Sequence, residues 1–366
     1  MGWVPRFPEL KANLGVNNGL FGSMLSMGAF GSLFALLTIG HLVDHFGGKR
    51  MLIAGQTILS ISYVSIVNVT NLQAFLLINI LVGFSISTLH IANNAQAFYD
   101  QDRGGKNLIV SAAGYWSAGS LFSTLLSMYL IGKVSLPLHI TILQIVCFLA
   151  SLFVILIRKE TLIPSNRHDQ VSKSILNDLK KFKFNWMINF GLIFGIMLEF
   201  AIGDWSTIFA KENGGISATW APLPFLFFTL FMIIGRVSIT PLRNRYKITR
   251  LVRFGGIVAG ISFLIGVWFI HIFGLAGLII TFSLAGLGSS FIGPSFLNIA
   301  NTRINLPSSI VIGQISAVNV MLSWVLKQVI AFVAQLAGLQ IALTIPALLA
   351  ISVGLFTKVF KPIPAK

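Results

Sequence analysis

Residues 40–50 read GHLVDHFGGKR and separate two apolar runs, 19–40 and 51–70. Each run is long enough to cross the hydrocarbon core of a bilayer as one helix, which takes about 20 mostly apolar residues. The charged residues and the paired glycines lie between the runs rather than within them. The stretch therefore predicts a helical hairpin in a membrane, with a short polar turn at one surface.

The rest of the chain repeats this pattern. None of the further apolar runs shows the short-period alternation of a membrane β-barrel strand. We expect an all-α membrane protein of 11 transmembrane helices (5 + 6) in two pseudo-symmetric bundles, 1–157 and 184–366, joined by a cytoplasmic linker, 158–183. The further runs are 74–98, 108–132 and 137–157, then 184–208, 217–241, 251–270, 274–300, 308–335 and 338–357.

Composition excludes a water-soluble protein. Only 10% of the 366 residues are charged, 55% are hydrophobic and the mean hydropathy is +0.86, whereas soluble proteins carry about 25% charged residues. The single cysteine, Cys147, excludes an intrachain disulfide and a thiolate metal cluster. The sequence shows neither a phosphate-binding loop nor a nucleophile–base–acid order, so we expect no enzyme activity, no cofactor and no metal.

The net charge of +16 reflects orientation in the membrane. Of the 26 Lys and Arg residues, 20 fall in loops on one side of the predicted spans and 4 on the other, while Arg236 and Lys327 lie inside spans. Cytoplasmic loops attract Lys and Arg, so the first side is the cytoplasm and the C-terminus is cytoplasmic. The basic charge is therefore explained by the orientation of the protein in the membrane and not by nucleic-acid binding.

The two halves of the chain repeat. The loop 40–50 has a counterpart at 235–250, and Arg50 and Arg250 lie 200 residues apart. Paired repeats are the common plan of secondary transporters. If the repeat is complete, the first half should have six spans, and it shows five.

The loop GHLVDHFGGKR resembles the cytoplasmic signature of the major facilitator superfamily, G-x-L-x-D-R-x-G-R-[RK], although His45 stands where that family usually has Arg. Residues 3–15 look like the outer loop after the first helix in a bacterial subgroup related to fucose permeases, and residues 199–205 resemble that subgroup's seventh helix. The loop positions that match the signature are Gly40, Leu42, Asp44, Gly47, Lys49 and Arg50.

This resemblance implies a twelve-helix secondary transporter in the bacterial inner membrane, working as a monomer by alternating access. It also implies that the first helix is missing from this sequence, through a start codon placed too late, because the chain is a fragment, or because the protein is a working eleven-helix variant. The implied cytoplasmic gating loop, which locks the two bundles in one state, comprises Gly40, Asp44, Gly47, Lys49, Arg50, Arg103 and Arg236.

Charged groups inside spans cost roughly 2.5–3.5 kcal/mol each on insertion scales, so they are candidates for function. Glu199 lies in the seventh helix and is the foremost proton carrier, with a structural carboxylate as the alternative. Asp204 and Lys327 should reach similar heights in the membrane and form an ion pair, for which Glu199 could compete. His90 is a further proton-coupling candidate, although a lone histidine in a bundle is more often a hydrogen-bonding side chain.

Two polar stripes at helical spacing predict the lining of a wet cavity or a contact with a partner helix. One contains Asn79, His90 and Asn94, and the other contains Lys327. Tryptophans near these faces could stack on a sugar, with packing or an interfacial position as the alternative. The substrate-cavity candidates are Asn79, Asn94, Trp116, Ser316, Asn319, Ser323 and Trp324.

The sequence thus favours proton-coupled movement of a small polar solute, such as a sugar, with the solute, protons and the lipid bilayer as partners. Proton-antiport efflux of amphipathic compounds is an alternative, as is a non-transporting remnant or sensor. A cavity rich in Asn and Ser favours the first, and an apolar cavity with Glu199 as its only charge favours efflux.

Overall fold

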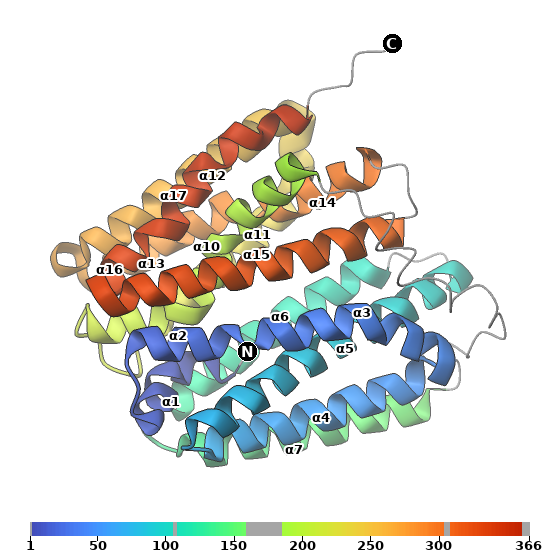
Figure 1. Ribbon diagram of the computed structural model, residues 1–366. Helices are drawn as coiled ribbons and strands as arrows, with labels where there is room; N and C mark the ends of the chain where they lie inside the picture. Colours follow the sequence, from blue (N-terminus) through green and yellow to red (C-terminus); the bar gives the residue numbers. More distant parts are fainter. Residues whose placement is uncertain (1, 105–107, 159–184, 304–307, 361–366) are drawn as a thin grey trace, which may run out of the picture.

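The computed structural model describes residues 2–104, 108–158, 185–303 and 308–360, and within these ranges it is helical, without strands (Figure 1). The N-terminal half contains η1 (Val4–Arg6), α1 (Phe7–Leu14), α2 (Asn18–Ser26), α3 (Gly28–Phe46), α4 (Gly48–Asn68), α5 (Leu72–Gly104), α6 (Leu108–Leu130) and α7 (Leu136–Ile157). The C-terminal half contains α10 (Trp186–Glu212), α11 (Leu223–Arg245), α12 (Ile248–Trp268), α13 (Ile270–Ser289), α14 (Ile292–Arg303), α15 (Ser308–Ala337), α16 (Leu339–Ala342), α17 (Thr344–Ser352) and η2 (Val353–Phe360).

The predicted membrane spans are helices in the structure. Over the described residues, nine helices or continuous helix pairs are long and apolar enough to cross a membrane, and the apolar segment Leu223–Ile239 is shorter. Three predicted runs are broken: α2 and α3 cover 19–40, α13 and α14 cover 274–300, and α16, α17 and η2 cover 338–357. Apart from Arg158, the predicted linker 158–183 lies outside the described residues.

The helices form two bundles, as predicted (Figure 1). In the N-terminal bundle α5 packs against α3 and α4, and α4 packs against α7. In the C-terminal bundle α13 packs against α11 and α12, while α10 contacts α11, α14, α15 and α17. Because α10 is surrounded by its own bundle, most of its side chains are buried, and the partly exposed residues between 196 and 204 mark the face that the bundle leaves open.

Glycines bring neighbouring helices into backbone contact. A Cβ at Gly31 would meet the backbone of Ile80, and one at Gly83 would meet the backbone of Gly28, so α3 and α5 touch directly. In the C-terminal bundle Gly255 and Gly288 bring α12 and α13 together in the same way. Small residues at such crossings let membrane helices approach closely and gain dispersion contacts.

Gly31→Ala is therefore expected to lower the midpoint of thermal unfolding, because its methyl group forces α3 away from α5. Overpacking of this kind costs about 1–3 kcal/mol. Gly40→Ala on the same helix is the matched control, since a Cβ at Gly40 has no neighbour within 4 Å and alanine favours a helix over glycine. Tryptophan fluorescence of the purified protein in detergent measures both midpoints, and equal midpoints would contradict the proposed contact.

The N-terminal segment 2–14 lies across one end of the molecule. Trp3, Phe7 and Leu10 are buried, and the Trp3 ring meets the rings of Phe7 and Tyr63 edge-on, each at 5.1 Å between centroids. The buried Arg6 donates hydrogen bonds to Glu9 and to the carbonyl of Val134. We call this end of the bundles the α1 end, and the opposite end, which holds the turn at Gly47, the α3–α4 end (Figure 1).

Candidate functional site

The open face of α10 carries both of its mid-helix acids. Ile196, Glu199, Phe200, Gly203 and Asp204 are partly exposed, while the residues between them are buried. Spacings of three and four residues place these five on one side of the helix. Glu199 lies midway along α10.

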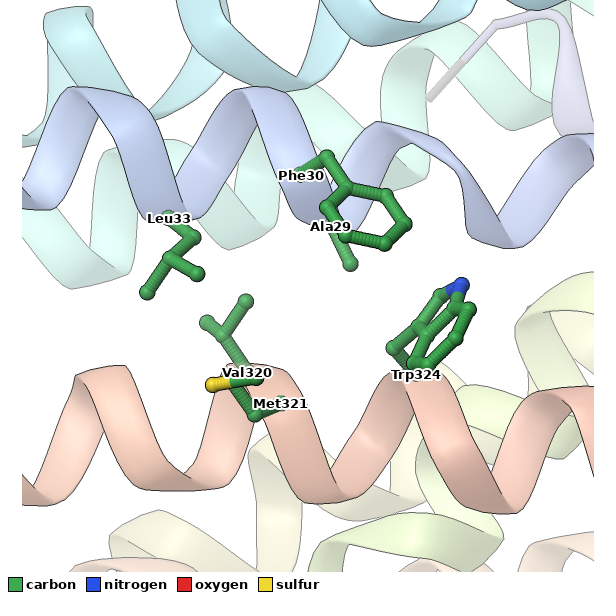
Figure 2. A pocket seen from close by; sticks show the side chains of 6 residues that line it. All are labelled: Ala29, Phe30, Leu33, Val320, Met321 and Trp324. Carbon is green, nitrogen blue, oxygen red and sulfur yellow. The ribbon is translucent and has the colours of Figure 1, made fainter.

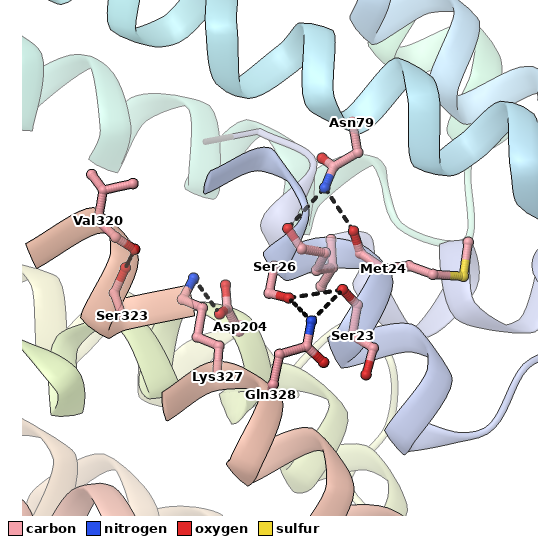
Figure 3. Close-up of polar contacts among 10 residues, drawn as sticks. Ser23, Met24, Ser26, Asn79, Asp204, Val320, Ser323, Lys327 and Gln328 are labelled. Atoms are coloured by element: carbon pink, nitrogen blue, oxygen red, sulfur yellow. Dashed lines mark hydrogen bonds and ion pairs between the residues drawn. The ribbon is translucent and has the colours of Figure 1, made fainter. Parts of the chain in front are cut away.

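Asp204 and Lys327 form an ion pair, as predicted. The Lys327 Nζ lies 2.7 Å from Asp204 Oδ2, and the two side chains are 22% and 23% exposed (Figure 3). The ammonium also lies 5.0 Å from the centre of the Phe200 ring. The pair connects α10 to α15 within the membrane-spanning region.

Glu199 pairs with Arg236 of α11 rather than with Lys327. Arg236 Nη2 lies 3.5 Å from Glu199 Oε2, and the side chains are 37% and 33% exposed. The Arg236 Nε donates to the carbonyl of Ser290 at 3.3 Å, next to the break between α13 and α14. Arg236 lies inside α11, which continues to Arg245, in agreement with its place in a predicted span; its part in the gating loop stays a prediction.

Three of the predicted cavity residues form hydrogen bonds with other residues of the protein. Asn79 Nδ2 donates to the carbonyls of Met24 and Leu25 at 2.9 and 2.8 Å, where α2 ends (Figure 3). Asn319 donates to Asn189 Oδ1 at 3.3 Å, and Ser323 donates to a carbonyl of its own helix. The stripes thus face partner helices at Asn79 and Asn319, which satisfies polar groups that would be costly in hydrocarbon.

The remaining polar candidates are more open. Asn94 is exposed and Ser316 is partly buried. The ring of His90 on α5 lies 6.3 Å from the ring of Trp116 on α6, and Trp116 is 45% exposed. Their role in binding a solute stays a prediction, and of these four residues His90 and Trp116 lie near each other.

An apolar pocket lies between α3 and α15. It is a small hollow that is open on one side, and its lining includes Phe30 and Trp324, whose ring centroids are 5.0 Å apart (Figure 2). The Trp324 Nε1 is buried and has no hydrogen-bond acceptor among the described residues. The other lining residues are Ala29, Leu33, Val320 and Met321.

Polar contacts join the two bundles at the α1 end. Gln328 Nε2 donates to Ser26 Oγ at 2.8 Å, next to the Asp204–Lys327 pair (Figure 3). Nearer the surface, Glu212 of α10 accepts from Lys11 at 2.5 Å and from Asn18 at 3.0 Å. The sequence carries no signal for these contacts, because Gln and Asn near span ends are common and the partners are distant in the chain.

The predicted gating loop is described in part. Gly47 has a φ of +83°, which a residue with a side chain rarely adopts, so it ends α3 and starts α4. Lys49 donates to the carbonyl of Leu156 at 3.3 Å, and Arg50 is exposed. Gly40 lies within α3, and the side chains of Asp44 and Arg103 lie outside the described part of the structure, so the predicted lock remains a prediction. Over the described residues, no cluster of His, Cys, Asp or Glu could hold a metal ion.

Comparisons with known proteins agree with this fold. An uncharacterized MFS-type transporter of Yersinia pestis is 24% identical over 357 residues, which cover 96% of this chain and 89% of that protein. The membrane protein MosC of Rhizobium meliloti is 23% identical over 296 residues, or 80% of this chain and 69% of that protein.

Solved structures give the same result. The nucleoside transporter NupG superimposes with a TM-score of 0.75 at 15% identity, over 99% of this chain and 95% of that one. The xylose transporter XylE from E. coli, in an inward-open conformation, superimposes with a TM-score of 0.69 at 13% identity, over 94% and 86%. At such low identity these likenesses show the fold alone. Because the profile of the Major Facilitator Superfamily matches residues 4–326 as well, the chain belongs to that superfamily of transporters and is not an enzyme.

Proposed function

We propose that the protein is a proton-coupled secondary transporter that moves a small polar solute by alternating access of its two bundles. The observation that carries this proposal is the placement of Glu199 and Asp204 on the open face of α10, each paired with a cation of another helix. A carboxylate inside a membrane defaults to a functional role because it is costly to keep there. Uptake or loss of a proton at either acid breaks or makes a contact between helices.

The contacts at the α1 end support alternating access. Hydrogen bonds hold the bundles together there, among Lys11, Asn18 and Glu212 and between Gln328 and Ser26. For a solute path to open at the α1 end, these contacts must break. The bundles can then form new contacts at the α3–α4 end, as in rigid-body domain motions. The Asp204–Lys327 pair lies beside Gln328 at this contact (Figure 3).

The solute class follows from the mixed character of the surroundings. The pocket between α3 and α15 is apolar, with one unpaired indole N–H, whereas Lys327 and Gln328 follow Trp324 by one turn on α15. A ring with an apolar face and polar edges, such as a sugar, suits both surfaces. NupG and XylE are, by name, nucleoside and xylose transporters, which supports a sugar-like solute here.

Efflux of an amphipathic compound by proton antiport is the second candidate. The apolar lining of the pocket favours it, since Phe30, Leu33, Val320 and Met321 offer no hydrogen bonds through their side chains. The ion pairs nearby favour the polar solute, and the direction of proton flow distinguishes the two. We further propose a bacterial inner-membrane location, a cytoplasmic C-terminus, a monomer and membership of the fucose-permease-like subgroup, on the residues given above.

Proteoliposomes that contain a pH-sensitive dye test the proposed function. The panel contains neutral and acidic solutes: D-xylose, D-galactose, uridine, D-galacturonate and D-glucuronate. At least one of them should move protons in the same direction as the solute, and a protonophore should abolish its accumulation. Proton flow opposite to an amphipathic cation would support efflux instead. Absence of any solute-dependent proton flow across the panel, with the protein correctly inserted, would contradict both candidates.

A further inference from the structure

The membrane-embedded charges of the C-terminal bundle form a neutral set. Among the described residues of this bundle, two acids, Glu199 and Asp204, and two cations, Arg236 and Lys327, lie more than six residues from either end of their helices. Each acid faces one cation in the structure. An uncompensated charge in such a place is costly, so any change in the charge of one member favours a compensating change nearby.

The two ion pairs differ in the distance between their charged atoms and in the exposure of their side chains. Lys327 contacts Asp204 at 2.7 Å and lies over the Phe200 ring, and both charged side chains are less than one-quarter exposed. Arg236 and Glu199 are 3.5 Å apart, each about one-third exposed or more. A guanidinium has five N–H donors, and among the described residues Arg236 makes one hydrogen bond, from Nε to Ser290. Its terminal nitrogens are therefore open to a second acceptor.

We propose that the transported solute is an anion whose carboxylate binds Arg236 in place of Glu199 when Glu199 takes up a proton. This proposal rests on the proposed function and names the solute class at the same site. The planar guanidinium matches a carboxylate through two parallel hydrogen bonds, which a single ammonium group cannot reproduce. Glu199 provides the charge that Arg236 needs when no solute is bound.

Charge balance distinguishes an anion from a neutral solute. In the empty protein Glu199 compensates Arg236. After a proton binds Glu199, the four groups carry one net positive charge, which a carboxylate solute cancels and a neutral sugar does not. Both the empty and the loaded protein then keep the site neutral while the bundles move, so that one proton and one anion cross together without net charge.

Other titratable groups do not supply this balance at the middle of α10. On the helices that pack against α10, Arg236 is the charged group that faces Glu199, and Lys327 is occupied by Asp204. The remaining groups belong to residues near helix ends or to the N-terminal segment. They are Arg6, Glu9, Lys11, Lys211, Glu212 and His271 toward the α1 end, and Arg243, Arg245, Arg253 and Lys358 toward the other end.

Matched pairs of an acid and its neutral counterpart test the proposal. Radiolabelled D-galacturonate and D-galactose, and D-glucuronate and D-glucose, are offered to proteoliposomes under an imposed pH gradient, with protein-free liposomes as the blank. The acids should accumulate about tenfold per pH unit, as expected for one proton per solute, and the neutral sugars should not. Accumulation should not change when valinomycin and potassium set the membrane potential.

Variants of Arg236 assign the binding to that side chain. Arg236→Gln should lower both accumulation and counterflow of the acids by about tenfold or more, since charge-assisted bonds are lost, and Arg236→Lys should restore part of the counterflow. Arg243→Gln, near the end of the same helix, is the matched control and should leave both unchanged. Wild-type activity in Arg236→Gln would overturn the assignment.

The outcomes separate this proposal from the proposed function. Proton-driven uptake of galactose or glucose without uptake of any tested acid overturns the anion proposal and leaves proton-coupled transport intact. Uptake of the acids that depends on membrane potential also overturns it. If neither acids nor sugars show proton-linked uptake, both the anion proposal and the proposed function fail.

Discussion

Glu199→Gln is expected to abolish proton-driven accumulation and to leave counterflow exchange. Glutamine keeps the size and hydrogen-bonding capacity of the side chain but cannot exchange a proton, so the solute still crosses while the pH gradient no longer drives it. With one proton per solute, a gradient of one pH unit supports about tenfold accumulation, and the variant should reach none. Uptake and counterflow of the same labelled solute in proteoliposomes measure both quantities.

Glu199→Asp is the control for this experiment. It retains a carboxyl group on the open face of α10 and should keep part of the accumulation, although its shorter side chain lies farther from Arg236, which is already 3.5 Å away. If Glu199→Gln accumulates solute as the wild-type protein does, Glu199 is not the proton carrier. Loss of counterflow together with accumulation would assign Glu199 to solute binding or to folding instead.

Lys327→Ala is expected to reduce transport about tenfold or more and to lower the midpoint of thermal unfolding, because it leaves Asp204 without its cation. Asp204→Asn in the same chain should restore a large part of the stability and some transport, since the uncompensated charge is then removed. The coupling between two residues in contact is about 0.5–3 kcal/mol in double-mutant cycles. Unfolding midpoints and uptake rates of the two single variants and the double variant provide the cycle.

Gln328→Ala combined with Asp204→Asn is the matched cycle for this pair. Gln328 neighbours Lys327 in sequence, but its side chain bonds to Ser26 and not to Asp204. Its effect should add to that of Asp204→Asn. Additive effects of Lys327→Ala and Asp204→Asn would show that the 2.7 Å contact does not couple the two residues.

The spans, the two bundles and the Asp204–Lys327 pair were predictable from the sequence. Long apolar runs have few folds available in a bilayer, because every backbone polar group must be satisfied within the segment. The pair followed from helical rise, since Asp204 and Lys327 reach similar heights on helices that run in the same direction. When one acid and one cation lie at the same depth with few other charges nearby, each is the expected partner of the other.

The partner of Glu199 was harder to predict. Arg236 lies inside the predicted span 217–241, but it also stands beside the second copy of the loop pattern, and the sequence analysis grouped it with the gating loop rather than with Glu199. Its pairing depends on how α11 is rotated against α10, which is set by packing such as that of Gly235 on Ser290. An arginine inside a predicted span was the available signal, because a charge there requires a partner.

The polar stripes show a second limit of the sequence. Helical spacing places Asn79 and Asn319 each on the polar face of its helix, but it does not tell whether that face meets water or another helix. In the structure Asn79 binds the end of α2, where the helix breaks before α3, and Asn319 binds Asn189. Breaks within a predicted span create unpaired carbonyls, and buried amides can satisfy them.

Cysteine accessibility along α10 tests most directly the central claim that its open face lines a water-reachable path between the bundles. In a Cys147→Ser background, Ile196→Cys, Phe200→Cys and Gly203→Cys should react with a charged, membrane-impermeant thiol reagent in inside-out or right-side-out vesicles. Met197→Cys and Ile202→Cys, whose side chains are buried in the structure, should not react. Protection of all five positions, or equal labelling of all five, would contradict the account.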